Sequence, residues 1–444
     1  MKFFFLIILL ILISNCSFDN KTGIWKNEQN KLSVKKDNGV FKDFQNINLS
    51  KNRNFDQIIE PEKNLNFFLD SKKTIANWKD QFFSNGNVYP NILYDKNNNT
   101  IKGKKLSTSQ LNQNIFFINN LLIASNFKGD LIVYSVTKKK ILNKYNFYKK
   151  KFKNIEKKLN IILFKDNLYI SDNIGFLYAY NYNSNKIIWA KKFPAPFRSN
   201  IKINNNKLYI ANENNSLFVI DVNDGSVIRK IPTEEVLIKN EFINNLSLDD
   251  KNLFYLNTFG TLYSLNQENL RLNWFRNINS TLDSSLNNLF SAQEIKISQN
   301  HLIIPGDSNL QVMDNFNGST KYIIPIHSKI PPIVNNNYIF IVSKNNLLIA
   351  LEINSGKIIY SFNIDKKVTE YLNKKKKEKI KIKYIHLINN KIFLFLHNSY
   401  IIEFNVNGEI EDLYKLPSKM SSKPIFVNNS MLYLNKSKKL ITLN

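Results

Sequence analysis

Short apolar runs separated by polar turns recur along most of the chain. Residues 168–192 read LYISDNIGFLYAYNYNSNKIIWAKK, in which three runs rich in Ile, Tyr and Leu are separated by turns containing Asn, Asp and Gly. Short runs of this composition between turn residues are typical of β-strands. Asn, Asp and Gly also adopt the left-handed backbone of tight turns at low cost. The pattern predicts antiparallel strands rather than helices, because no interior segment keeps a helical apolar period between caps.

An Asn in the turn before the second run marks a repeat with intervals of 37 to 53 residues. It occurs at Asn120, Asn167, Asn206, Asn252, Asn300, Asn337, Asn390 and Asn429. Each unit has up to four apolar runs. In the third unit these are Ile201–Ile203, Leu208–Ala211, Leu217–Val222 and Val227–Ile231. Eight units of four short strands predict an all-β fold, an eight-bladed β-propeller of four-stranded antiparallel blades.

The last unit is one strand short. Its runs are Ile425–Val427, Met431–Leu434 and Leu440–Leu443, and the sequence then stops at Asn444. A blade without its outer strand exposes a sheet edge, which proteins normally cover. We therefore expect an N-terminal strand to close the ring, and we place it between Ile75 and Tyr94, where Trp78 and strand-like runs precede the first unit.

Large rings fall at matching ends of fourth strands. Trp189, Trp274 and Tyr360 occupy these positions. Aromatic side chains bury a large area, so we interpret them as packing between adjacent blades rather than as a ligand-stacking site.

The N-terminus predicts export. An apolar run from Phe3 to Ile13 follows Met1 and Lys2 and is too short to span a bilayer, but it has the length of a signal-peptide core. Ile13-Ser14-Asn15-Cys16 then resembles a lipobox, although Asn15 replaces the usual small residue. The alternative is an ordinary secretory peptide with an incidental cysteine. We predict a lipoprotein signal peptide at 1–15, a lipidated Cys16 with a polar tether at 16–70, and the propeller at 71–444.

Cysteine content and charge limit the other functions. Cys16 is the only cysteine, so the chain forms no internal disulfide. The net charge of +27 comes mostly from scattered lysines, and an exported chain without a nucleic-acid motif has no evident nucleic-acid partner. The densest run, Lys374 to Lys383, is interpreted as a solvated loop between repeats.

The repeats resemble a known family. LYISDNIGFLYAYNYNSNKIIW, LYIANENNSLFVIDVNDGSVI and IFIVSKNNLLIALEINSGKIIY are similar to the pyrroloquinoline-quinone-like (PQQ-like) repeat. Eight such units behind a lipobox resemble the BamB family of outer-membrane barrel-assembly lipoproteins, over about residues 75 to 444. The resemblance implies a noncatalytic scaffold on the periplasmic face of the outer membrane. Its expected partners are the periplasmic (POTRA) domains of the barrel insertase and unfolded outer-membrane proteins.

The same resemblance implies partner-binding residues. Phe197 and Arg198, in the loop from Pro194 to Asn200, stand where the family carries its insertase contact, and Glu234 and Glu235 stand in the next interblade connection. An apolar anchor beside an Arg suits an interface hot spot. The alternative is a solvated loop with Phe197 turned into the core.

Two other functional classes remain open. Quinoprotein dehydrogenases use the same repeat but resemble this chain less, since it lacks their adjacent cysteines. His301, His327, His386 and His397 show no metal-ligand spacing, and neither a Gly-x-Ser-x-Gly elbow nor a glycine-rich phosphate loop is present. We therefore expect no catalytic residue, metal or cofactor. A glycan-binding envelope propeller is the third class.

Overall fold

The computed structural model describes residues 55–62, 65–97, 99–235, 243–279, 290–374 and 379–444. All of these residues belong to one compact unit, Asn52–Asn444. The predicted signal peptide and Cys16 lie outside the described residues.

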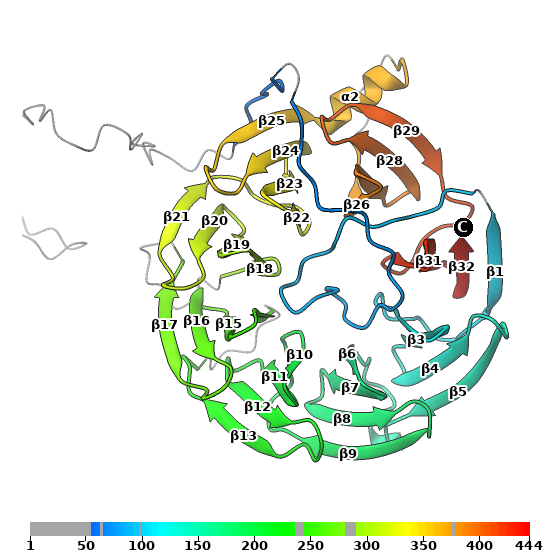
Figure 1. Cartoon of the computed structure of the whole chain (residues 1–444). Coiled ribbons are helices and arrows are strands. Elements are labelled where there is room, and N and C mark those ends of the chain that lie inside the picture. The colour runs from blue at the N-terminus through cyan, green and yellow to red at the C-terminus, as the bar shows by residue number, and fades with distance from the viewer. Residues whose placement is uncertain (1–54, 63–64, 98, 236–242, 280–289, 375–378) are drawn as a thin grey trace, which may run out of the picture. The chain divides into compact units, whose positions relative to one another are not determined.

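The described residues form eight four-stranded antiparallel sheets arranged as the blades of a propeller (Figure 1). The innermost strands are β2 (Phe116–Ile118), β6 (Leu159–Phe164), β10 (Lys202–Asn204), β14 (Asn245–Leu248), β18 (Lys296–Ser298), β22 (Ile333–Asn335), β26 (Ile382–Ile388) and β30 (Ile425–Val427). The second strands are β3 (Leu121–Ser125), β7 (Asn167–Asp172), β11 (Lys207–Ala211), β15 (Asn252–Leu256), β19 (His301–Pro305), β23 (Tyr338–Val342), β27 (Lys391–Leu396) and β31 (Ser430–Leu434). The third strands are β4 (Asp130–Ser135), β8 (Phe176–Asn181), β12 (Leu217–Asp221), β16 (Thr261–Asn266), β20 (Leu310–Asp314), β24 (Leu347–Glu352), β28 (Tyr400–Asn405) and β32 (Lys439–Leu443). The outer strands are β5 (Lys140–Asn146), β9 (Lys186–Lys192), β13 (Val227–Ile231), β17 (Leu272–Asn277), β21 (Thr320–Ile324), β25 (Ile358–Asn363), β29 (Ile410–Lys415) and β1 (Thr100–Lys105).

The predicted eight-bladed propeller is thus confirmed, and the turn Asn residues explain part of it. Asn120, Asn206, Asn390 and Asn429 have φ between 57° and 63°, the left-handed region that Asn tolerates better than most residues. In other blades the left-handed residue comes slightly earlier, as at Gln299. These turns let the first and second strands pair directly, for example with Ile203 opposite Leu208.

A recurring contact packs neighbouring blades together. The Trp189 ring lies against Gly225 in the turn between the third and fourth strands of the next blade, and Trp274 lies in the same way against Gly318. Trp189 Nε1 also donates to the Val222 carbonyl at 2.9 Å. Tyr360 is fully buried in the core around the sixth and seventh blades. The interblade packing predicted for these three rings is therefore confirmed.

The ring is closed by an N-terminal strand, but a different one from the strand we placed. β1 pairs antiparallel with β32, with Thr100 opposite Leu443 and Lys102 opposite Ile441. Residues 75–94 are not the closing strand, so that placement was wrong. The sequence of β1, TIKGKK, is polar because an outer strand is largely exposed, and a search for apolar runs therefore passed over it.

Residues 70–95, here called the central segment, instead run through the middle of the ring (Figure 1). Trp78 and Ile92 are almost fully buried there. In the described structure, hydrogen bonds join the central segment to the innermost strand, or to the turn beside it, in each of the eight blades. The bonds are Trp78 N to Phe117 O (2.7 Å), Leu163 N to Lys79 O (2.9 Å), Lys202 Nζ to Asp80 Oδ2 (2.6 Å), Leu248 N to Asn85 O (2.9 Å), Ile297 N to Gly86 O (2.9 Å), Asp70 N to Asn335 Oδ1 (2.9 Å), Ile92 N to Leu387 O (3.0 Å) and Asn428 N to Ile75 O (2.7 Å).

The chain before the central segment also lies against the propeller. Residues 55–62, the N-terminal strap, follow the outer edge of the sixth blade, where Ile59 and Ser361 exchange two backbone hydrogen bonds of 2.9 Å. Phe67 then packs against Tyr338, with ring centroids 4.8 Å apart. The part of the predicted tether from residue 55 onward is therefore in contact with the blades.

Two features of the connections differ from expectation. α2 (Ile364–Tyr371) is an α-helix where we expected none; Asn363 caps it by accepting a hydrogen bond from Lys366 N at 3.0 Å. The lysine-rich run is not entirely a loop, because Ile382 and Lys383 belong to β26, while residues 375–378 lie outside the described part.

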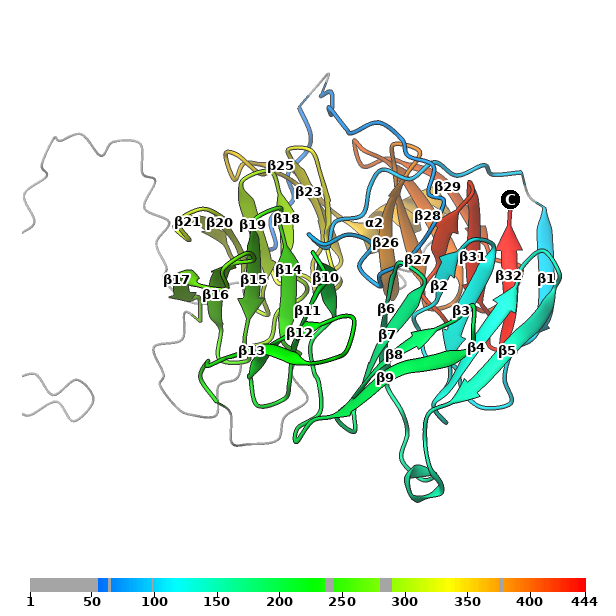
Figure 2. The same ribbon diagram turned by 60° about the horizontal axis from the view of Figure 1, so that its bottom comes forward.

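The connection from β5 to β6, which carries the short 3-10 helix η1 (Lys150–Phe152), extends well beyond the neighbouring loops (Figure 2). No helix in the described ranges is long and apolar enough to cross a membrane.

Candidate functional site

The connection between β9 and β10 carries the first pair of predicted contact residues, and the structure separates them. Phe197 is 2% exposed, and its ring centroid lies 4.9 Å from that of Phe193 and 6.2 Å from that of Phe218. It therefore supports the loop from within the core, which is the alternative position considered for it. Its role in partner binding remains a prediction, and any such role is indirect in this conformation.

Arg198, the next residue of the same loop, is less buried than Phe197. Its side chain is 26% exposed, and Nη2 lies 3.4 Å from Glu213 Oε2 in the β11–β12 turn. Its Nε is buried without a hydrogen-bond partner among the described residues. Arg198 is thus paired at Nη2 and unpaired at Nε, and it is one of the residues that line a cavity described below.

Glu234 and Glu235 lie in the next connection, between β13 and β14. Glu234 Oε2 accepts hydrogen bonds from Thr261 Oγ1 at 2.6 Å and from Asn257 Nδ2 at 3.0 Å, both in the following blade. Glu235 is exposed and lies 3.4 Å from Lys230 Nζ. Residues 236–242 of this connection lie outside the described part. The structure brings both connections onto one face of the ring but shows no direct contact between Arg198 and these glutamates.

A cavity of about 430 Å³ occupies the mouth of the central channel on this face. The central segment supplies part of its wall with Gln81, Phe82 and Tyr89, and the starts of the innermost strands supply most of the rest. Its charged and titratable lining consists of Tyr89, Arg198, Glu294, Lys383, Tyr384, His386 and Lys423. The central segment and the blades thus build this cavity together.

Three lysines surround the central segment close to the cavity. Lys202 is fully buried and forms an ion pair of 2.6 Å with Asp80 Oδ2. Lys296, only 1% exposed, donates to the Asn87 carbonyl at 2.8 Å. Lys423 donates to the Tyr89 hydroxyl. In the described ranges, neither Lys296 nor Lys423 forms an ion pair with a carboxylate.

Burial shifts the titration of these groups, because a poorly solvated site disfavours the charged form. It lowers the pKa of Lys296 to about 8, with nearby Lys423 and Lys202 adding to the effect against the opposing charge of Glu294. Burial likewise lowers the pKa of Lys423 and, well below its usual range, that of His386. His386 is therefore neutral at neutral pH, while Lys296 keeps most of its charge.

We did not predict the channel-mouth cavity from the sequence, although the sequence contains one indication of it. The third and fifth units open with the same Ile-Lys-Ile tripeptide, at 201–203 and 295–297. A Lys between two Ile residues in an innermost strand is unusual, since Lys is almost never fully buried without a partner. The partner of Lys202, Asp80, lies outside the repeats, so the repeat pattern alone did not predict it.

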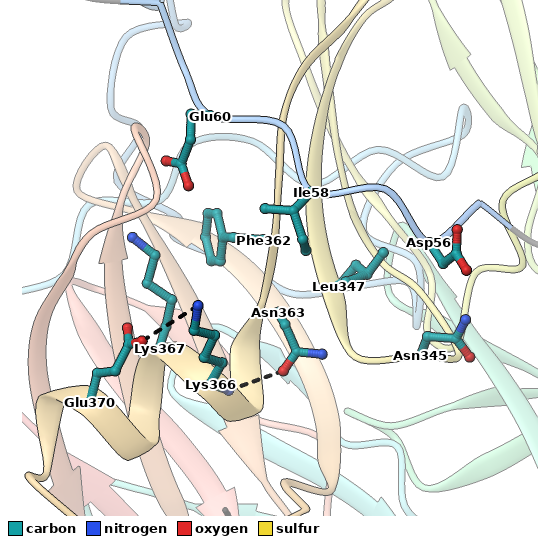
Figure 3. Close-up of a pocket in the computed structure, with 10 residues that line it drawn as sticks. All are labelled: Asp56, Ile58, Glu60, Asn345, Leu347, Phe362, Asn363, Lys366, Lys367 and Glu370. Atoms are coloured by element: carbon teal, nitrogen blue, oxygen red, sulfur yellow. Dashed lines mark hydrogen bonds and ion pairs between the residues drawn. The ribbon is translucent and has the colours of Figure 1, made fainter.

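A second cavity, of about 390 Å³, lies beneath the N-terminal strap (Figure 3). It is lined by Ile58, Leu347 and Phe362 together with charged residues of α2, of which Lys366 and Glu370 lie 3.8 Å apart. Within the described residues, no group of three or more His, Cys, Asp or Glu side chains is placed to hold a metal ion.

Comparison with known proteins agrees with the fold. A family model described as outer membrane protein assembly factor BamB matches residues 157–362. A curated protein of that name from Moranella endobia (strain PCIT) is 23% identical over 222 residues, covering 44% of this chain and 55% of that protein, so the match spans about half of the relative. The crystal structure of BamB from Moraxella catarrhalis matches with a TM-score of 0.59 at 14% identity, covering 77% of this chain and 99% of that one. The computationally designed Ika8 protein matches with a TM-score of 0.57 at 10% identity, covering 77% and 98%. These matches confirm the resemblance of the repeats.

Proposed function

We propose that this chain, a PQQ-like repeat propeller of the BamB family, takes part in outer-membrane protein assembly as a noncatalytic scaffold. The observation that supports this most is the agreement between the family match over residues 157–362 and a closed ring of eight blades. The relatives with this name are assembly factors. Scaffolding requires a rigid body with accessible loops, and a ring of mutually packed blades provides one.

The proposal includes attachment to the periplasmic face of the outer membrane through a lipid on Cys16. The described residues of the predicted tether contact the blades, which leaves residues 17–54 between Cys16 and the first of them. An extended chain advances roughly 3.3 Å per residue, so even this shorter tether allows the propeller to reach partners away from the lipid surface.

The partners proposed are the POTRA domains of the barrel insertase, held by the face that carries Arg198, Glu234 and Glu235. Arg198 is partly exposed beside the channel mouth, and Glu235 is exposed at the rim. The pairing of Arg198 with Glu213 orients its guanidinium, and a fixed planar donor suits carboxylate recognition. Phe197 contributes by anchoring the loop against Phe193 and Phe218 in the core rather than by reaching the partner.

Unfolded outer-membrane proteins are proposed as transient ligands of the outer strands. Leu142, Ile188, Ile228 and Phe275 are 45–56% exposed on β5, β9, β13 and β17. An extended segment can add to such an edge through main-chain hydrogen bonds. The pairing of Ile59 with Ser361 on the sixth blade provides an example of that geometry within the chain itself.

Isolation of the lipidated full-length protein from envelope extract tests this function. We expect the barrel insertase to co-purify and to be identified by mass spectrometry, with an unrelated outer-membrane lipoprotein as the control. Enrichment of polysaccharide-processing proteins instead, or quinone-dependent dye reduction by the purified protein, would support a glycan-binding or dehydrogenase function and contradict the proposal.

A further inference from the structure

The channel-mouth cavity collects polar atoms that lack hydrogen-bond partners. Five such buried atoms in the described structure belong to residues lining it: Arg198 Nε, Glu294 Oε2, the Tyr384 hydroxyl, and both ring nitrogens of His386. His386 is 1% exposed. Buried polar groups almost always have partners, so a cluster of unpartnered ones around a single cavity indicates a site for a polar occupant.

The charge balance selects the kind of occupant. Arg198, Lys383 and Lys423 line the cavity against a single lining carboxylate, Glu294, and of these cations only Arg198 has a carboxylate partner elsewhere among the described residues, Glu213. Lys296 adds a further buried ammonium close by, while Asp80 is already paired with Lys202. Water can satisfy the neutral groups, but it compensates buried positive charge poorly, and burying unpaired charge is costly. The surplus of positive charge around the cavity therefore favours an anion as its occupant.

The remaining lining adds two requirements. Phe82, Pro331, Pro332 and Ile333 form an apolar part of the wall, which suits a carbon skeleton rather than a bare inorganic ion. Glu294 Oε2 accepts no hydrogen bond in the described structure, so the occupant needs a donor group such as a hydroxyl. The cavity volume of about 430 Å³ is in the range of small-molecule sites.

We infer that the channel-mouth cavity binds a small organic oxyanion carrying a hydroxyl group, of the hydroxycarboxylate class, with Lys423 and Tyr384 on the carboxylate and Glu294 on the hydroxyl. Neutral His386 supplies one donor and one acceptor to the same occupant. This inference does not depend on the proposed assembly function.

Calorimetric titration of the full-length protein tests it, with citrate, malate and succinate as probes at an ionic strength held constant with chloride. We expect saturable binding of one citrate or malate per chain, and weaker binding of succinate, which has the same carboxylates as malate but no hydroxyl to donate to Glu294.

Two variants and a control make the test specific. Lys423→Met should weaken citrate binding by about tenfold or more, the usual effect of losing a charged hydrogen bond. Lys366→Gln, on the exposed side of α2, removes the same charge away from the cavity and should bind as the parent does. Tyr384→Phe removes one oxygen, keeps the ring, and should weaken binding severalfold.

The outcomes separate clearly. If Lys423→Met fails to fold, Tyr384→Phe decides, because its hydroxyl makes no hydrogen bond in the described structure. No saturable heat with any of the three probes, or equal citrate affinity for Lys423→Met, Tyr384→Phe and Lys366→Gln, would overturn the inference. Co-purification of the insertase with Tyr384→Phe should be unchanged, so the failure of one proposal is distinguishable from the failure of the other.

Discussion

Lys202 Nζ lies 2.6 Å from Asp80 Oδ2, in an ion pair that joins the innermost strand of the third blade to the central segment. The Lys202 side chain is fully buried and that of Asp80 is 9% exposed. The same ammonium donates to the Ser84 carbonyl at 2.7 Å. This pair therefore fixes the central segment at the middle of the ring.

Breaking this pair should destabilise the propeller strongly. Asp80→Asn leaves the Lys202 charge buried without its carboxylate, which typically costs about 3–5 kcal/mol. Urea denaturation followed by tryptophan fluorescence measures the loss. The matched control is Glu62→Gln, which breaks the exposed 2.8 Å pair with Lys357 and should leave the urea midpoint nearly unchanged, because solvent screens exposed ion pairs. Equal effects of the two variants would show that the central segment is not held as described.

Gly225→Ala should also destabilise the fold, through both the backbone of its turn and the contact with Trp189. Gly225 has φ of +72°, and an added Cβ would lie 2.7 Å from the Trp189 ring. Strained backbone and overpacking together should cost about 2–4 kcal/mol, measured as a fall in the urea midpoint. Asn223→Ala, in the same turn but exposed, is the control. A Gly225→Ala protein as stable as the control would contradict the packing role of Trp189.

Replacement of residues 100–105 by a Gly-Ser sequence of the same length should loosen ring closure. β32 then loses its antiparallel partner β1, and Gly-rich segments form strands poorly. We expect amide hydrogen exchange in Leu440–Leu443 to accelerate by about tenfold or more. Exchange in Lys207–Ala211 of the third blade, which β1 does not touch, serves as the internal reference. Unchanged exchange in β32 would mean that β1 does not close the ring.

Stability should rise with pH above neutrality, in part because of Lys296. Its pKa is lowered to about 8 in the folded protein from 10.5. Between these values the unfolded chain binds more protons, so the free energy of unfolding increases with pH, by at most about 3 kcal/mol from this group. Below about pH 8 the full penalty of the buried charge is present.

Lys296→Met should flatten that rise, as measured by urea denaturation between about pH 7.5 and 9.5. The range ends there because Tyr89 and Tyr255 have raised pKa values, so the folded state retains their protons and loses stability at higher pH. Lys366→Gln is the exposed control. An identical pH slope in parent and Lys296→Met would contradict the assignment.

Arg198→Ala should weaken capture of the insertase's periplasmic domains without unfolding the propeller. The 3.4 Å pair with Glu213 is partly exposed, so its loss should cost only about 1 kcal/mol of stability. Co-purification compares this variant with Arg229→Ala, an exposed Arg on β13. Equal recovery of the insertase with both variants would remove Arg198 from the interface.

The sequence alone determined the number and internal order of the blades. Turn residues such as Asn206 and Gly225 and the apolar strands between them act over a few positions, because strands of one blade pair with their sequence neighbours. The need for an N-terminal closing strand followed from counting apolar runs, because the last unit has three of them where the third unit has four. The interblade positions of Trp189 and Trp274 were predictable because they repeat.

Only the tertiary structure decided which segment closes the ring and what fills its centre. β1 pairs with residues more than 330 positions away, and its exposed, polar sequence carries no apolar signal. Asp80 meets Lys202, and Lys423 meets Tyr89, only once eight blades form a channel around residues 70–95. Such contacts depend on the curvature of the whole ring, which no local pattern encodes. For the same physical reason the repeats predicted a scaffold but not the cavity at its centre.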